Sequence, residues 1–145
     1  MTESNTEQIR VWLVEDNEVF RRNVQRVING LDGMTCDGSF DSAEATFAAL
    51  QTNPAPDVIL LDVQLPGVDG IAALSKFLEA VPEVRVIILT VFDDADKIFR
   101  AVCAGASGYV LKASGTDKIG ESIRQVMGGG APMTLSLGST SGTMA

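Results

Sequence analysis

Residues 58–63 have the sequence VILLDV, and this short run decides the fold class. The four consecutive apolar residues 58–61 leave no polar face, which is typical of a central parallel strand that helices cover on both sides. Asp62 ends the apolar run. Because such a sheet binds its ligands at the carboxyl ends of its strands, this carboxylate is the first candidate functional group.

Chemically active side chains also end three other strand-like runs. Glu15 and Asp16 follow IRVWLV at Ile9–Val14, Thr90 ends VIILT, and Lys112 ends GYVLK. Taken one at a time, each is best explained as a solvated loop residue. Together with Asp62 they would place three carboxylates, a hydroxyl and an ammonium on one rim, where clustered carboxylates repel one another unless a cation lies among them. The combination predicts a metal site that handles phosphate.

Amphipathic helical patterns alternate with the strands along the chain. We expect strands at residues 9–14, 34–40, 58–63, 84–90 and 108–112, each followed by a helix with apolar residues at three- and four-residue spacing. The second helix is expected to start at an Asp41 N-cap with Glu44 three residues later, and the fourth to span about residues 94–104. This (βα)5 order predicts an α/β fold, a parallel sheet with helices on both faces.

Composition indicates one domain and excludes several function classes. The chain has 145 residues, a net charge of -8 and a pI of about 4.4, which argues against binding nucleic acid or an anionic membrane directly. It has no histidine, and Cys36 and Cys103 are not spaced as a metal pair, so zinc and haem chemistry are not expected and both cysteines are interpreted as buried free thiols. No apolar run approaches the length of a membrane span, and the polar start MTESNTEQ is unlike a signal peptide. A cytoplasmic protein is expected.

The two ends differ in composition from the part between them. Residues 1–8 are polar and are expected to be flexible. Residues 128–145 contain no charged residue and are rich in Gly, Ser and Thr, so that residues 131–145 are expected to be a flexible tail or a truncated linker. The folded domain is therefore expected to span residues 9–130.

Four motifs, in order along the chain, resemble the receiver domains of two-component response regulators. They are the acidic pair in LVEDN, the segment LLDVQLPGVDG around Asp62, the LT at Thr90 and the GYVLK at Lys112. The resemblance covers about residues 9–130 and implies a flavodoxin-like sheet with strand order 2-1-3-4-5. It implies these roles: phosphoacceptor, Asp62; Mg²⁺ ligands, Glu15, Asp16, Asp62 and the backbone carbonyl of Gln64; switch hydroxyl, Thr90; phosphoryl-contacting lysine, Lys112; switch aromatic, Tyr109.

Three longer segments are similar to the subfamily whose receivers precede a helix-turn-helix DNA-binding domain. They are LTVFDDAD, GASGYVLKAS and VMGGGAPM. The resemblance implies a sensor histidine kinase or a phosphotransfer protein as phosphodonor, homodimer formation, and control of transcription through a DNA-binding domain outside these 145 residues. It implies no enzymatic activity beyond self-phosphorylation and autodephosphorylation.

Two departures from the family pattern leave the functional groups in place. Val91 is bulkier than the small residue that many receivers carry after the switch hydroxyl, and slower dephosphorylation is the expected consequence. Ala113 stands where many receivers have a proline after a cis peptide. A cis bond before alanine costs about 3–4 kcal/mol, so the sequence leaves the isomer of the Lys112–Ala113 bond open.

Other functions remain alternatives at this point. A stand-alone receiver that acts by direct protein contact is one of them. An aspartyl-nucleophile phosphatase is disfavoured, because Gln64 stands two residues after Asp62, where that class needs a second acid. Flavin binding is disfavoured because Asp16 and Glu18 would repel a phosphate after the first strand.

Overall fold

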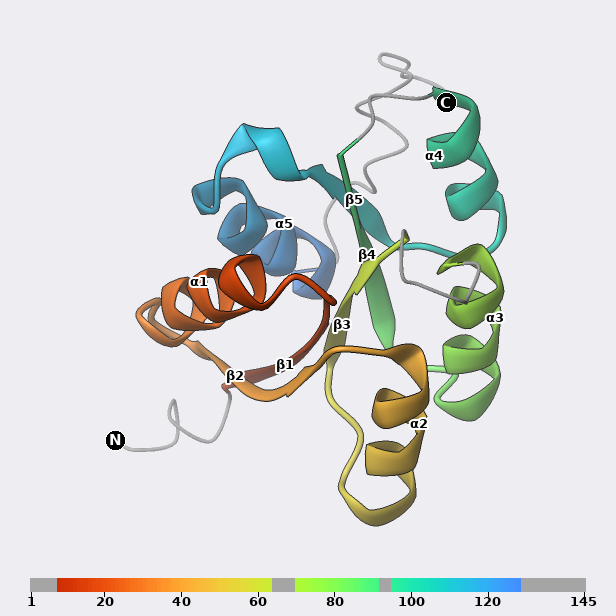
Figure 1. Ribbon diagram of the computed structural model, residues 1–145, viewed down its shortest axis with the longest axis horizontal. Helices are drawn as coiled ribbons and strands as arrows, with labels where there is room; N and C mark the ends of the chain where they lie inside the picture. The colour runs from red at the N-terminus through yellow and green to blue at the C-terminus, as the bar shows by residue number, and fades with distance from the viewer. Residues whose placement is uncertain (1–7, 64–69, 92–94, 129–145) are drawn as a thin grey trace.

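The computed structural model describes residues 8–63, 70–91 and 95–128. Strands and helices alternate as the sequence predicts (Figure 1). The elements are β1 Ile9–Val14, α1 Glu18–Asn29, β2 Met34–Phe40, α2 Ala43–Thr52, β3 Val58–Asp62, α3 Gly70–Ala80, β4 Arg85–Thr90, α4 Ala95–Cys103, β5 Gly108–Leu111, the 3-10 turn η2 Lys112–Ser114, and α5 Asp117–Met127. The predicted (βα)5 order is confirmed.

The strands form a parallel sheet in the order β2-β1-β3-β4-β5, as predicted. β3 lies at its centre, paired with β1 and β4, and all five of its residues are buried. Its continuous apolar run is explained by this position, since both faces of the strand pack against helices. The chain therefore carries Asp62 to the middle of the carboxyl rim.

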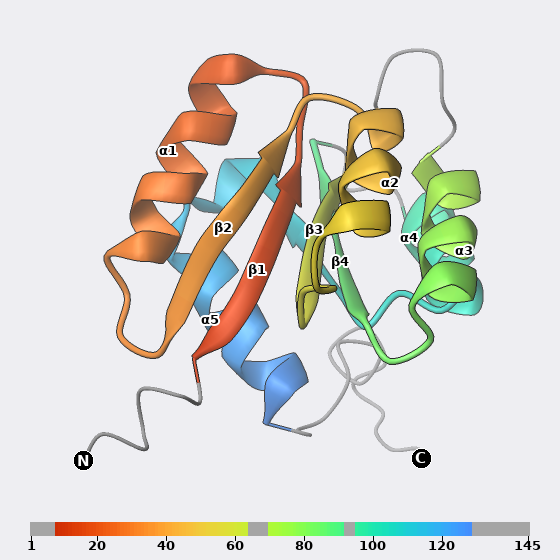
Figure 2. The same ribbon diagram turned by 90° about the horizontal axis from the view of Figure 1, so that it is seen from below.

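Helices cover the two faces of the sheet unequally. α1 and α5 lie on one side, and α2, α3 and α4 lie on the other (Figures 1 and 2). Val24 and Ile28 of α1 and Ile123 of α5 are fully buried in the first apolar layer. Leu74 and Phe77 of α3 fill the second layer, where Phe77 stacks on Phe47 of α2 with ring centroids 4.3 Å apart. Two apolar layers therefore hold the strands in register beneath the rim.

Three expectations about local structure need correction. The N-cap of α2 is Ser42 and not Asp41, because the Ser42 hydroxyl accepts a hydrogen bond from the backbone N–H of Ala45 at 3.0 Å. Lys112 does not end β5 but begins η2. Cys103 is exposed, because it lies at the end of α4 away from the apolar layer, whereas Cys36 is buried as expected.

One irregularity in the sheet was not predicted. The register of β1 against β2 shifts between Val11 and Trp12, which pair with Cys36 and Gly38, so that Asp37 is the extra residue of a bulge. The Asp37 carboxylate accepts hydrogen bonds from the indole of Trp12 at 3.1 Å and from the guanidinium of Arg10 at 2.8 Å. Gly38 lies against the Trp12 ring, where a Cβ would approach Cδ1 to 2.5 Å. The bulge therefore holds the side chain of Trp12 in place, three residues before Glu15 along the chain.

Some expectations concern residues that are not described. The flexible ends predicted for residues 1–8 and 131–145 fall outside the described ranges except for Gln8, and Gln64 falls outside them as well. Among the helices of the described ranges, none combines the length and the apolar character needed to cross a membrane.

Candidate functional site

The end of β1 turns one carboxylate inward and leaves the next at the surface. The backbone N–H of Glu15 still bonds to the carbonyl of Phe40 at 2.9 Å, which extends the β1–β2 pairing by one residue. The side chain of Glu15 is 1% exposed, whereas Asp16 is exposed. The acidic pair thus offers one buried oxygen ligand and one that solvent can reach.

Asp62 meets this pair from the neighbouring strand. It is 2% exposed at the end of β3, and its Cα lies opposite Leu89 of β4. One carboxylate oxygen from each of Glu15, Asp16 and Asp62 lies within 4.8 Å of the others. Hard divalent cations prefer carboxylate oxygens. This donor set fits such an ion, and the exposed Asp16 leaves a route for it from solvent.

Lys112 brings the positive charge of the site. Its Nζ lies 2.7 Å from Oε1 of Glu15 and 3.4 Å from Oδ2 of Asp62, and its side chain is 16% exposed. The ammonium approaches Oε1 of Glu15 without the alignment of a good hydrogen bond, so the pair is held mainly by charge. The peptide bond to Ala113 is trans, as are the other peptide bonds of the described residues. The Lys112 side chain therefore reaches the two carboxylates from η2 with a trans peptide bond after it and alanine, not proline, at position 113.

The electrostatics of Glu15 reflect its burial. Burial raises the pKa of this carboxyl above its ordinary value of 4.5, the ammonium of Lys112 and the backbone N–H of Asn17 oppose the rise, and the charge of Asp62 adds to it. The Asn17 N–H donates to Oε2 of Glu15 at 3.0 Å. A buried carboxylate beside a second one binds either a proton or a cation more readily than a solvated one does. The site is therefore suited to a metal ion.

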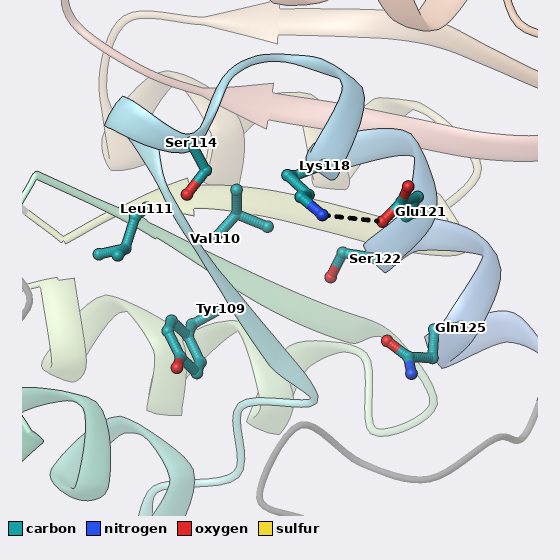
Figure 3. Close-up of a pocket in the computed structure, with 8 residues that line it drawn as sticks. All are labelled: Tyr109, Val110, Leu111, Ser114, Lys118, Glu121, Ser122 and Gln125. Carbon is teal, nitrogen blue, oxygen red and sulfur yellow. Dashed lines mark ion pairs between the residues drawn. The ribbon is translucent and has the colours of Figure 1, made fainter. Parts of the chain in front are cut away.

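Thr90 lies at the end of β4 beside this cluster, and Tyr109 lies on the neighbouring strand β5. Thr90 is 3% exposed, and its Cα pairs with Leu111, the residue before Lys112. Tyr109 is half-buried and packs against the apolar layer that α3 and α4 cover. Figure 3 shows Tyr109 among the residues that line a pocket between β5 and α5, with its ring and Val110 on opposite sides of the strand. The volume of this pocket is about 370 Å³. Thr90 thus ends its strand next to the cluster, and Tyr109 lies three residues before Lys112 along β5.

The first turn of α1 supplies contacts that the sequence did not predict. Asn17 caps the helix by accepting from the backbone N–H of Phe20 at 2.9 Å. Arg21 donates to the backbone carbonyl of Glu15 at 2.8 Å, and the Phe20 ring lies under the ammonium of Lys112. Asn directly after the acidic pair is a recognisable N-cap signal, but the contacts with Glu15 and Lys112 depend on the folded arrangement.

Comparison with known proteins agrees with this geometry. The model of the response regulator receiver domain family matches residues 11–124. The response regulator GacA of Pseudomonas aeruginosa is 33% identical over 121 residues, which are 83% of this chain and 56% of GacA. The uncharacterized transcriptional regulatory protein YxjL of Bacillus subtilis is 36% identical over 127 residues, 88% of this chain and 58% of YxjL. The chain therefore spans somewhat more than half the length of these relatives.

Solved structures extend the comparison to three dimensions. A two-component response regulator of the LuxR family from Aurantimonas sp. SI85-9A1 has a TM-score of 0.77 and 29% identity, over 85% of this chain and 87% of that one. The response regulator domain of CheB from Thermotoga maritima has a TM-score of 0.73 and 28% identity, over 83% and 97% of the two chains. Because the family model matches most of the chain and the fold agrees with it, this chain belongs to the response regulator receiver domain family.

Proposed function

We propose that Asp62 is the phosphoacceptor of a two-component signalling pathway. The observation that carries the proposal is the Lys112 ammonium lying between Glu15 and Asp62, at 2.7 Å and 3.4 Å, beside three carboxylates clustered within 4.8 Å. Phosphoryl transfer needs alignment and positive charge around the transferred group more than it needs covalent chemistry by the protein. A buried carboxylate with an ammonium beside it offers both.

The donor would be the phosphohistidine of a sensor kinase or of a phosphotransfer protein. An oxygen of Asp62 attacks phosphorus, the P–N bond to the histidine breaks, and an acyl phosphate forms, while the donor imidazole keeps the electron pair of that bond. The same attack on a small acyl phosphate is the proposed self-phosphorylation. As the acyl phosphate forms, the new phosphoryl oxygens would attract the Lys112 ammonium, which lies near Glu15 and Asp62 before the transfer. The hydroxyl of Thr90 would donate a hydrogen bond to one of those oxygens.

Mg²⁺ is the metal that we propose for this donor set. Glu15, Asp16 and Asp62 would hold it together with the backbone carbonyl of Gln64, and a bound Mg²⁺ neutralises charge on the transferred phosphoryl group. Asp16 is exposed, which leaves room for the water ligands that Mg²⁺ retains.

The output would be carried by the face that α4, β5 and α5 form. Movement of Thr90 toward a phosphoryl group would change the packing of Tyr109, and a partner domain or a second copy of the chain would read the altered face. The relatives are response regulators and transcriptional regulatory proteins, which favours control of transcription as the final output. With a net charge of -8, the chain itself is not expected to bind DNA.

Mass spectrometry after incubation with acetyl phosphate and Mg²⁺ tests the phosphoacceptor. We expect one added phosphoryl group on the wild-type protein, mapped to the peptide that contains Asp62, and none on Asp62→Asn. Asp32→Asn is the matched control, because Asp32 is exposed in the turn between α1 and β2, and it should be labelled like the wild type. Equal labelling of Asp62→Asn and the wild type would refute the assignment.

A further inference from the structure

The aromatic ring of Phe20 lies against the Lys112 ammonium of the carboxylate cluster. The Nζ of Lys112 is 4.9 Å from the centroid of this ring. A cation within about 6 Å of an aromatic face is attracted by the ring quadrupole. Phe20 is half-buried and packs against the apolar layer under α1 and α5, so its ring is supported from behind.

The ring and the two carboxylates act on the ammonium in different ways. Nζ is 2.7 Å from Glu15 and 3.4 Å from Asp62, and is therefore 0.7 Å (3.4 − 2.7) closer to Glu15. A phenyl ring attracts the charge of the ammonium but offers its N–H groups no oxygen acceptor. The ring thus attracts the ammonium without replacing its contacts with Glu15 and Asp62.

The first turn of α1 fixes the ring and Glu15 together. Asn17 binds the backbone N–H of Phe20 through its side chain and Oε2 of Glu15 through its own N–H. Arg21 binds the Glu15 carbonyl from the next position of the helix. Ordering the long, flexible side chain of Lys112 costs rotamer entropy. A ring that this turn holds in place reduces the freedom of the ammonium before any phosphoryl group arrives.

We propose that Phe20 is a positioning residue that keeps the Lys112 ammonium beside Asp62 and thereby speeds phosphoryl transfer. The effect on rate rests on the proposed function of Asp62, whereas the contact itself does not. Phe20→Leu keeps an apolar side chain on the helix and removes the ring face. Phe20→Tyr keeps the ring.

The first measurement is the rate of Asp62 labelling by acetyl phosphate with Mg²⁺. Phe20→Leu should slow labelling roughly two- to fivefold, the fold-change that corresponds to a cation–π contact at a partly exposed site. Phe20→Tyr should stay near the wild-type rate. Phe47→Leu is the matched control, because Phe47 is a half-buried aromatic on the opposite face of the sheet, where it stacks on Phe77. It should lower the melting temperature and leave the labelling rate unchanged.

The second measurement distinguishes positioning from general support of the fold. In a Lys112→Met background, Phe20→Leu should cause no further slowing, because the residue through which it acts is gone. NMR should find the ε-methylene protons of Lys112 shifted upfield by the ring in the wild type and in Phe20→Tyr, but not in Phe20→Leu.

Three results would overturn the proposal. They are an unchanged labelling rate in Phe20→Leu, an equal slowing in the Lys112→Met background, or Lys112 proton shifts that are the same in Phe20→Leu and the wild type. A wild-type protein that is not labelled at Asp62 would refute the proposed function instead. The NMR comparison would then decide the contact between Phe20 and Lys112 by itself.

Discussion

Helices α1 and α4 both border the carboxyl rim, but they are attached to the molecule in different ways. α1 buries Val24 and Ile28 completely, and residues at its start contact Glu15 and Lys112. α4 spans Ala95–Cys103, buries Ile98 and Ala101, and exposes 62% of Phe99. The start of α1 thus forms part of the site. α4 buries smaller side chains and presents an aromatic side chain to solvent.

This difference suggests that α1 and α4 have different roles at the rim. Groups that perform phosphoryl chemistry must be held in place, because catalysis by alignment is lost when they drift. Segments that report a chemical change have to move at little cost, and such segments come from the less stable parts of a fold. The contacts of α1 with Glu15 and Lys112 suit the first task, and the smaller side chains that α4 buries, Ile98 and Ala101, suit the second.

Substitution of the buried Ile28 of α1 and of the exposed Phe99 of α4 should give the largest difference in stability. Ile28→Ala removes a fully buried side chain of α1 and should lower the free energy of unfolding by about 2–5 kcal/mol. Phe99→Ala removes a larger side chain from the exposed face of α4 and should change it by less than about 0.5 kcal/mol. Urea unfolding measures both. Comparable losses would contradict the proposed difference between the helices.

Removal of the site cation should be the next largest effect. Lys112→Met leaves Glu15 and Asp62 buried without the ammonium that lies between them, and should destabilise the Mg²⁺-free protein by roughly 3 kcal/mol at pH 7. Lys118→Met is the control, because Lys118 pairs with Glu121 at 3.6 Å between two exposed side chains, and it should cost less than about 1 kcal/mol. If thermal unfolding gave equal shifts for the two variants, the account of the carboxylate cluster would be wrong.

Cys36, which is buried under α1, and Cys103, which is exposed on α4, allow the two helices to be compared through the pH dependence of stability. Burial raises the pKa of Cys36, in β2 under α1, from its ordinary 9.0 to about 11. The folded state thus retains the thiol proton more strongly than the unfolded state, and this contribution is present below pH 9 and lost as the pH rises toward 11.

The wild type should therefore lose on the order of 2–3 kcal/mol more than Cys36→Ala between pH 9 and pH 11, since one pKa unit corresponds to about 1.4 kcal/mol. Cys103→Ala changes an exposed thiol on α4 and should follow the wild-type profile. Urea unfolding at several pH values gives the three profiles. A Cys36→Ala profile parallel to that of the wild type would show that Cys36 is not buried as described.

Much of the fold and of the site was predictable because both depend on strong local patterns. β3 is apolar on both faces, and a strand of this kind has few positions other than the centre of a parallel sheet. Once the five strands are assigned, the parallel topology brings Glu15, Asp62 and Thr90 to one rim. Their burial at 1%, 2% and 3% agrees with that placement.

What the sequence did not reveal depends either on contacts between distant segments or on a choice between two nearly equivalent residues. Asp41 and Ser42 are both good N-caps, and the choice between them follows from how the chain leaves β2. Cys103 is an apolar residue type in an amphipathic helix, and its exposure follows from the face on which it lies. The ring of Phe20 meets Lys112 across 92 positions of the chain (112 − 20), so no local pattern could indicate it.

Amide hydrogen exchange with and without beryllofluoride, an analogue of the phosphoryl group, tests the division between α1 and α4 most directly. With Mg²⁺ present, occupancy of Asp62 should change exchange in α4 and β5, Ala95–Cys103 and Gly108–Leu111, and leave the core of α1 around Val24 and Ile28 unchanged. Exchange in Asp62→Asn should not change when beryllofluoride is added. Unchanged exchange in α4 and β5 of the occupied protein, or a change confined to α1, would contradict the account.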